Sequence, residues 1–156
     1  MPLIAADTNL KRWLLCRVGS RLCALPVENI VETMRPLPIE PLPQSPPFVL
    51  GLCLLRGAPV PVVDARLLFG EHGDPPERLV AIRVGSRLIA LAVDSVIGLR
   101  SIEADTSVGL PLLLQDAGDV VAAVGTLDAE LLLVLNTARM VPLAVLDSVD
   151  ADGTSM

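Results

Sequence analysis

Few of the side chains that carry out chemistry in proteins occur in this sequence, and their spacing points to no known kind of site. The three cysteines, Cys16, Cys23 and Cys53, have none of the spacings of a zinc ligand set. Buried free thiols are the ordinary state of cysteine in a reducing compartment, and we expect them here. The single histidine, His72, lies in the glycine- and proline-rich stretch 69–76, which has the composition of a loop. We therefore expect His72 to be solvated rather than catalytic.

Two carboxylates, Asp64 and Asp94, each follow directly after an apolar run. A carboxylate in this place usually caps a helix or a turn, and we expect that structural role for both. The same pair could supply the acid and the base of a small hydrolase, but the sequence places no nucleophile and no environment that shifts a pKa beside them. With a single histidine and no metal cluster, the sequence lacks the side chains that most acid–base and nucleophilic reactions require.

Composition narrows the class of protein further. Hydrophobic residues make up 52% of the 156 residues but aromatic residues only 2%, so the core must consist of Leu, Val, Ile and Ala. The net charge of −6 argues against nucleic acid as a partner, because phosphate binding needs a cationic surface. No apolar stretch reaches the roughly 18 residues of a membrane span, and Asp7 interrupts the place of a signal peptide. We therefore expect a cytoplasmic protein without membrane insertion.

An internal repeat is the strongest signal in the sequence. The segment Arg17-Val-Gly-Ser-Arg-Leu22 recurs unchanged as Arg83-Val-Gly-Ser-Arg-Leu88, 66 residues later. Residues 12–32 aligned with 78–98 share ten identities in 21 positions, and most of the differences are conservative. The chain therefore contains two copies of one supersecondary unit.

The first part of each copy predicts a β-hairpin. Apolar, β-prone residues lie on both sides of Gly-Ser, which favours a two-residue turn of a primed type. The predicted strands are 11–18 and 21–27 in the first copy, and 78–84 and 87–93 in the second. We expect Trp13, on the first of these strands, to pack in the core.

The turn determines which residues face each other across the first hairpin. With two residues in the turn, Cys16 lies opposite Cys23, and the second copy has Ile82 and Ile89 in the same places. This apolar pair supports a packing role for the two thiols. The position is also a hydrogen-bonded one, whose wide Cα spacing suits a disulfide less well. We expect both thiols to be reduced and buried.

A second unit follows each hairpin. In the first copy it begins with 36–47, which holds six prolines and can be neither a helix nor a central strand. The strands predicted after it are 48–55 and 60–63, and their counterparts in the second copy are 120–127 and 131–135. Asp64 is expected to cap a short helix, 65–69, and Asn136 takes its place in the second copy. About ten short strands without a long helix favour small barrels or sandwiches. We expect the leucine-rich runs 110–114 and 131–135 to be core.

Four segments of the sequence form a recognisable pattern. They are Leu25-Pro-Val-Glu-Asn-Ile-Val-Glu32, Pro43-Gln-Ser-Pro-Pro-Phe-Val-Leu-Gly51, Leu55-Arg-Gly-Ala-Pro-Val-Pro-Val-Val-Asp-Ala-Arg66 and Leu91-Ala-Val-Asp-Ser-Val-Ile-Gly98. Together they resemble the CheW-like coupling domain, the adaptor of bacterial chemosensory arrays. The resemblance covers nearly the whole chain, and the third segment together with the proline-rich loop before it is quite specific. One departure is Leu54, where relatives often carry Asn.

The resemblance implies an all-β fold of two interlocked five-stranded SH3-like β-barrels with short helical segments. These would form one domain, 11–146, between flexible termini at 1–10 and 147–156. It also implies no enzymatic activity, and we expect no catalytic residue, cofactor or metal. The implied function is a scaffold that couples the cytoplasmic tips of methyl-accepting chemoreceptors to the regulatory domain of a CheA-type histidine kinase. The alternative is an adaptor of another pathway, either a pilus or twitching-type chemosensory system or polar localisation, with a different protein partner.

The resemblance also indicates where partners bind. Arg56 matches a well-marked arginine of the family and Glu32 its acidic position, and we predict a partner-binding site there that includes Ile30, Leu55 and Gly57. Physical reasoning agrees for Arg56, because an arginine between an apolar strand and a glycine turn should emerge at the end of a barrel, where it can bind carboxylates or carbonyls. Alternatively, Arg56 forms an internal salt bridge to Glu32 or Asp64. The two interpretations are compatible, since an internal pair would orient the arginine for a partner.

Overall fold

A computed structural model describes residues 11–73, 75–102 and 121–137. These residues form ten strands, one short α-helix and one 3₁₀ turn, so the predicted all-β class is confirmed. The termini predicted to be flexible, the end of the predicted domain and the run 110–114 lie outside the described residues. No helix in the described ranges is long and apolar enough to cross a membrane.

The two predicted hairpins are confirmed almost residue for residue. Their strands are β1 (Lys11–Val18), β2 (Arg21–Pro26), β6 (Arg78–Val84) and β7 (Arg87–Val93). Gly19 and Gly85 have φ angles of 62° and 63°, as a primed turn requires at its first central position. β2 ends one residue earlier than predicted because Val27 begins the 3₁₀ turn η1 (Val27–Asn29).

The second unit of each copy contains the predicted strands and, before them, one strand that was not predicted. The unit consists of β3 (Ile30–Met34), β4 (Val49–Leu55), β5 (Ala58–Asp64) and α2 (Ala65–Leu68) in the first copy, and of β8 (Ser95–Ile102), β9 (Val121–Leu127) and β10 (Glu130–Leu135) in the second. The strands that were not predicted are β3 and β8. Asp64 is the N-cap of α2, and its carboxylate accepts a hydrogen bond of 2.9 Å from the backbone N–H of Arg66. The expected capping role of Asp64 is therefore confirmed.

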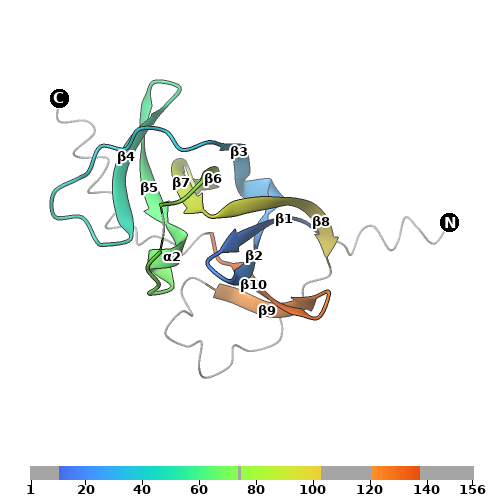
Figure 1. Cartoon of the computed structure of the whole chain (residues 1–156). Helices are drawn as coiled ribbons and strands as arrows, with labels where there is room; N and C mark the ends of the chain where they lie inside the picture. The colour runs from blue at the N-terminus through green and yellow to red at the C-terminus, as the bar shows by residue number, and fades with distance from the viewer. Residues whose placement is uncertain (1–10, 74, 103–120, 138–156) are drawn as a thin grey trace.

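The two copies exchange strands to build two five-stranded sheets (Figure 1). One sheet has the order β8-β1-β2-β10-β9 and the other β3-β6-β7-β5-β4. Each hairpin thus lies in the middle of a sheet whose other three strands all belong to the other copy. Two parallel pairings, β2 with β10 and β5 with β7, are the equivalent joints of this exchange. The predicted pair of interlocked five-stranded units is confirmed.

Three apolar clusters fill the fold, and strand periodicity explains them. The largest contains Leu14, Cys16 and Val18 together with residues of the other sheet, so it lies between the two sheets. The alternate residues Trp13 and Leu15 belong to a second cluster drawn from the first sheet alone. A third cluster belongs to the second sheet alone. Because both faces of each sheet are covered, each sheet curls around a core of its own.

Two expectations about the core have different outcomes. Trp13 is only 5% exposed, so its predicted core position is confirmed. The run 131–135 was expected to be core throughout, but Leu131 is 65% exposed. The reason is its position at the start of β10, where it pairs with Thr126 beyond the reach of the cluster that buries residues 132–135.

The proline-rich loop is bonded to the middle of the outer strand β4 as well as to its first residue, Val49. Glu40 and Leu52 exchange two backbone hydrogen bonds, of 2.7 and 2.8 Å, and 36–47 contains no helix. Gly51 makes this close approach possible, because a Cβ at its place would overlap the carbonyl oxygen of Glu40. Its φ angle of 147° also disfavours any other residue. Gly51 therefore fixes the loop against the sheet.

All three cysteines are free and buried. Cys16 pairs with Cys23 and Ile82 with Ile89, as the turn predicts. Burial raises the pKa of the Cys16 thiol, and it raises the pKa of Cys23 to about 12. Both groups therefore stay neutral at physiological pH, and a neutral thiol is a poor nucleophile.

We expect a thiol reagent such as 5,5′-dithiobis(2-nitrobenzoate) to leave Cys16 and Cys23 unmodified in the native protein at pH 8. The same reagent should modify them rapidly in denaturant, where the side chains reach water and the pKa returns to about 8.5. Peptide mapping after alkylation distinguishes the sites. Rapid native modification of this pair would contradict the described packing.

Candidate functional site

The β4–β5 turn holds Arg56 in an unusual backbone conformation. Leu55 pairs with Ala58, which leaves Arg56 and Gly57 as the two turn residues, with φ angles of 54° and 83°. Positive φ at both positions is typical of a type I′ turn, where Gly, Asn and Asp are favoured. Gly57 adopts this conformation without cost, whereas an arginine loses about 1 kcal/mol or more there. The local stability of the turn therefore does not explain why position 56 is an arginine.

The guanidinium of Arg56 is bound within the chain and is still accessible. Its Nη2 donates a hydrogen bond of 2.7 Å to Oε2 of Glu32, while 75% of the arginine side chain stays exposed. The predicted salt bridge to Glu32 thus exists together with an exposed, oriented guanidinium, which has donors left for a partner. Asp64, the other predicted acceptor, is occupied by its capping bond instead.

This ion pair also spans the two edges of its sheet. Glu32 lies on β3 and Arg56 follows β4, and these are the first and last strands in the order β3-β6-β7-β5-β4. A contact between opposite edges requires the sheet to curl until its edges meet. The pair therefore marks the place where the second sheet closes, at an end of the predicted barrel.

The remaining predicted site residues lie close to this pair in the sequence, but they differ in how exposed they are to solvent. Ile30, two residues before Glu32, is half-buried and packs against the core between the sheets. Leu55 is half-buried too and packs against the cluster of the second sheet. Gly57 is exposed, and no atom lies within 4 Å of where its Cβ would be. Arg56 and Gly57 thus present the exposed part of the site, and Ile30 and Leu55 hold its strands in place.

The second copy of the repeat lacks this arrangement. Its equivalent turn is Asp128-Ala129, with φ angles of 51° and 64°, and Gly98 stands in the register position of Glu32. An aspartate opposite a glycine cannot form the ion pair. The two halves share a backbone but only the first carries the charged pair, so the pair is not a requirement of the fold.

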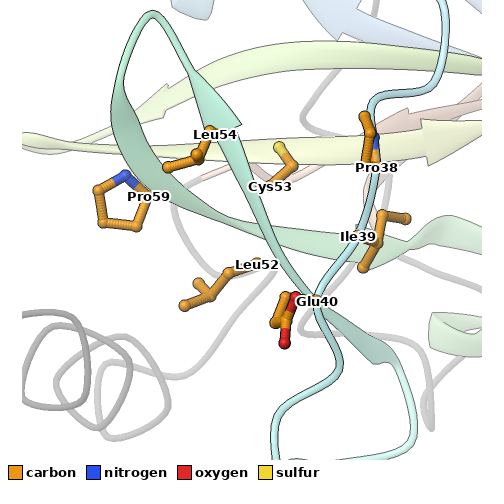
Figure 2. Close-up of a pocket in the computed structure, with 7 residues that line it drawn as sticks. All are labelled: Pro38, Ile39, Glu40, Leu52, Cys53, Leu54 and Pro59. Atoms are coloured by element: carbon orange, nitrogen blue, oxygen red, sulfur yellow. The ribbon is translucent and has the colours of Figure 1, made fainter.

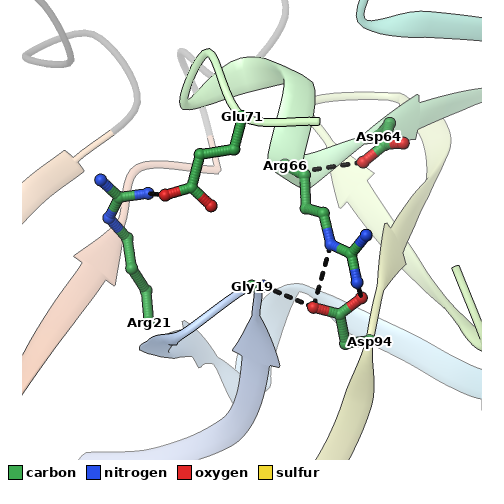
Figure 3. A network of polar contacts seen from close by, with 6 residues as sticks. All are labelled: Gly19, Arg21, Asp64, Arg66, Glu71 and Asp94. Carbon is green, nitrogen blue, oxygen red and sulfur yellow. Dashed lines mark hydrogen bonds and ion pairs between the residues drawn. The ribbon is translucent and has the colours of Figure 1, made fainter. Parts of the chain in front are cut away.

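A second polar cluster, which the sequence did not reveal, joins the two sheets (Figure 3). The carboxylate of Asp94 accepts hydrogen bonds from the backbone N–H of Gly19 and from the guanidinium of Arg66, the latter at 3.1 Å from Nε. The Asp94 N–H donates in turn to the carbonyl of Arg17, at 2.9 Å. Asp94 was expected to cap a turn, and the turn it caps belongs to the other copy. Only the strand exchange brings these residues together.

Further ion pairs surround the first hairpin. Arg21 pairs with Glu71 and lies over the ring of Phe69, 5.0 Å from its centroid. Arg17 pairs with Glu130 at the start of β10, and this hydrogen bond lowers the pKa of the Glu130 carboxyl. Residues of the first hairpin thus contact acids from distant parts of the chain.

The possible acid–base pair can now be judged from the geometry. Asp64 and Asp94 both contact Arg66, one through its backbone N–H and the other through its guanidinium. Both carboxylates are therefore engaged in structural bonds. His72 lies exposed in its loop, and the described residues contain no cluster of His, Cys, Asp and Glu suited to a metal ion.

The fold defines a class of protein: an all-β module of two interlocked five-stranded sheets. The sequence model of the CheW-like domain family matches residues 12–144, and the chain belongs to this family. Its members are non-enzymatic scaffold and adaptor proteins of chemosensory signalling. The fold and the absence of enzymatic function expected from the resemblance are thus confirmed.

Individual relatives agree with this assignment. Protein FrzA of Myxococcus xanthus is 35% identical over 104 residues, 64% of each chain, so the match spans less than two thirds of that relative. Chemotaxis protein CheW of Helicobacter pylori is 25% identical over 79% of this chain and 76% of its own length. The crystal structure of scaffolding protein TtCheW from Thermoanaerobacter tengcongensis superposes with a TM-score of 0.72, at 21% identity, over 81% of this chain and 89% of that one.

The unusual φ angle of Arg56 leads to a stability prediction. Arg56→Gly should raise the free energy of unfolding by up to about 1 kcal/mol, because relief of the positive φ exceeds the small contribution of an exposed ion pair. Arg56→Ala, which loses the pair and keeps the positive φ, is the matched control and should be no more stable than the natural chain. Urea denaturation measures both variants. A glycine variant less stable than the alanine variant would contradict the prediction.

The Asp94 cluster leads to a second stability prediction. The side chains of Arg66 and Asp94 are only 17% and 19% exposed, so Asp94→Asn leaves a largely buried guanidinium without its counter-charge. We expect a loss of about 3 kcal/mol in the free energy of unfolding. Glu130→Gln, which breaks the more exposed pair with Arg17, should cost much less. Equal losses in the two variants would show that the Asp94 cluster has no special part in joining the sheets.

Proposed function

We propose that this chain is the adaptor that couples the cytoplasmic tips of chemoreceptors to the regulatory domain of a CheA-type histidine kinase. Membership of the CheW-like family supports this proposal, as does the similarity to chemotaxis proteins named CheW. The proposal places the chain in the cytoplasm, where receptor tips and kinase meet.

The observation that carries the proposed contact is the exposed, oriented Arg56. Its guanidinium is held by Glu32 yet remains mostly in contact with solvent, and its backbone conformation is unfavourable for an arginine. Strained residues persist where function requires them. A pre-oriented guanidinium loses little side-chain freedom on binding, and it can make bidentate hydrogen bonds to a partner carboxylate or to backbone carbonyls. We infer that Arg56, Glu32 and Gly57 touch the partner and that Ile30 and Leu55 support them.

A second pathway is also a candidate. FrzA is more similar in sequence than the Helicobacter CheW, 35% against 25%, although over a shorter span. The same adaptor fold would then serve a different chemosensory system with another receptor and kinase. Pull-down experiments with receptor tips and kinase regulatory domains from each system of the same genome separate the two pathways.

The binding prediction concerns Arg56→Ala. Loss of a guanidinium from the centre of an interface typically costs about 2 kcal/mol, so we expect a complex roughly thirtyfold weaker with the receptor tip, the kinase domain or both. Calorimetric titration of the purified chain measures this affinity, and thermal melting checks the fold. Arg78→Ala, which removes an exposed arginine at the start of β6, is the control and should bind normally. A variant that is less stable but binds with unchanged affinity removes Arg56 from the site.

A further inference from the structure

The β4–β5 hairpin carries an apolar pocket beside the Arg56 turn (Figure 2). Leu54 is 68% exposed, and its cross-strand partner Pro59 is exposed as well. The pocket has a volume of about 400 Å³ and is lined by Pro38, Ile39, Glu40, Leu52, Cys53, Leu54 and Pro59. In Figure 2 the β4 residues lie between the 38–40 segment and Pro59. An exposed leucine at the rim of an apolar pocket is a feature of binding surfaces.

The backbone of Leu54 is open on the side of this pocket. Leu55–Ala58 closes the turn, so the N–H and C=O of Leu54 point away from β5, on the same side as those of Leu52. Leu52 uses its groups to bond Glu40, but the next residue in that register is Pro38, which has no N–H to donate. Among the described residues none hydrogen-bonds to this side of Leu54. One donor and one acceptor are therefore available to an extended chain.

A cationic groove adjoins the pocket. It has a volume of about 500 Å³, and its lining consists of Ala58, Pro59, Val60, Pro61, Arg83, Ser86, Arg87 and Leu88. Pro59 belongs to both linings, so the pocket and the groove meet at this residue. Among the described residues, the lining of this groove contains two arginines and no acid, in a protein of net charge −6. Arg83 is exposed and forms no salt bridge with any described residue.

We propose that this surface, the Leu54 surface, binds an extended segment of a partner protein in which an apolar residue is followed by acidic ones. The apolar side chain enters the pocket beside Leu54, and the backbone of the segment bonds the free N–H and C=O of Leu54 in the manner of an added strand. The acidic side chains then reach Arg83 in the groove. Charge complementarity selects this occupant, because the groove is cationic on a chain that repels acidic segments elsewhere. The inference does not depend on which pathway the adaptor serves.

Selection from random peptides displayed on phage tests the proposed chemistry without assuming a sequence. The full chain is the target, and the double variant Leu54→Glu/Arg83→Glu is the counter-target. We expect the enriched peptides to carry an aliphatic or aromatic residue followed by Asp or Glu. Enrichment of basic peptides, of peptides without charge, or of none that prefer the natural chain would overturn the proposal.

A synthetic peptide with the selected sequence then tests the assigned residues. Its affinity, measured by fluorescence anisotropy, should fall about tenfold for Leu54→Asn and for Arg83→Gln, as loss of one anchoring contact implies, and should fall with added salt. Arg78→Gln, an exposed arginine on the same strand β6 at its other end, is the matched control and should bind normally. Equal effects of the two arginine variants would overturn the proposal.

Sedimentation of the chain alone tests the competing occupant, a second copy of this chain. If the natural chain forms a dimer that Leu54→Asn dissolves, the surface is a self-association interface and the peptide proposal fails. We expect the same sedimentation for both proteins. Because Leu54 is mostly in solvent, its replacement should leave the melting temperature unchanged, so that any loss of binding reports on contact rather than folding.

Discussion

Two parallel strand pairings, β2 with β10 and β7 with β5, hold the two copies of the repeat in one fold. Each hairpin is apolar on both faces, so it must be covered twice: once by the other sheet and once inside its own curl. Only strands from the other copy supply the missing neighbours. The polar clusters follow from this exchange, since Asp94 reaches Gly19 and Arg66 only because the copies interlock. The core and the joints between sheets are thus consequences of one topology.

The surface around Arg56 shows how two copies of a repeat have diverged within that topology. Both copies keep the strand bulge at one register position, at Val31 and at Ile97, and both keep a tight turn with positive φ. Side chains differ where the backbone is the same: the Arg56–Glu32 pair in one half corresponds to Asp128 and Gly98 in the other. A symmetric backbone therefore carries an asymmetric surface.

The sequence alone predicted the local elements well, because hairpins with Gly-Ser turns depend on neighbouring residues. The register that places Cys16 opposite Cys23 follows from the turn length and was predicted correctly. Contacts between segments that are distant in the sequence were harder to predict. The Arg66–Asp94 pair had no signal in the sequence, because no local pattern reports which hairpin lies beside which helix. The predicted core position of Leu131 was wrong, because the apolar character of a residue does not show where a strand extends beyond the core. The Arg56–Glu32 pair was found because a family resemblance marked both positions.

The strand exchange has a consequence for the way the chain is made. The ribosome releases β2 (Arg21–Pro26) well before its parallel neighbour β10, which occupies residues 130–135. Until β10 is made, the β1–β2 hairpin lacks the strand that pairs with β2 in the folded protein, and its apolar faces stay uncovered. Such an unpaired strand edge attracts other nascent chains. We therefore expect a chain whose synthesis stops before β10 to aggregate rather than fold.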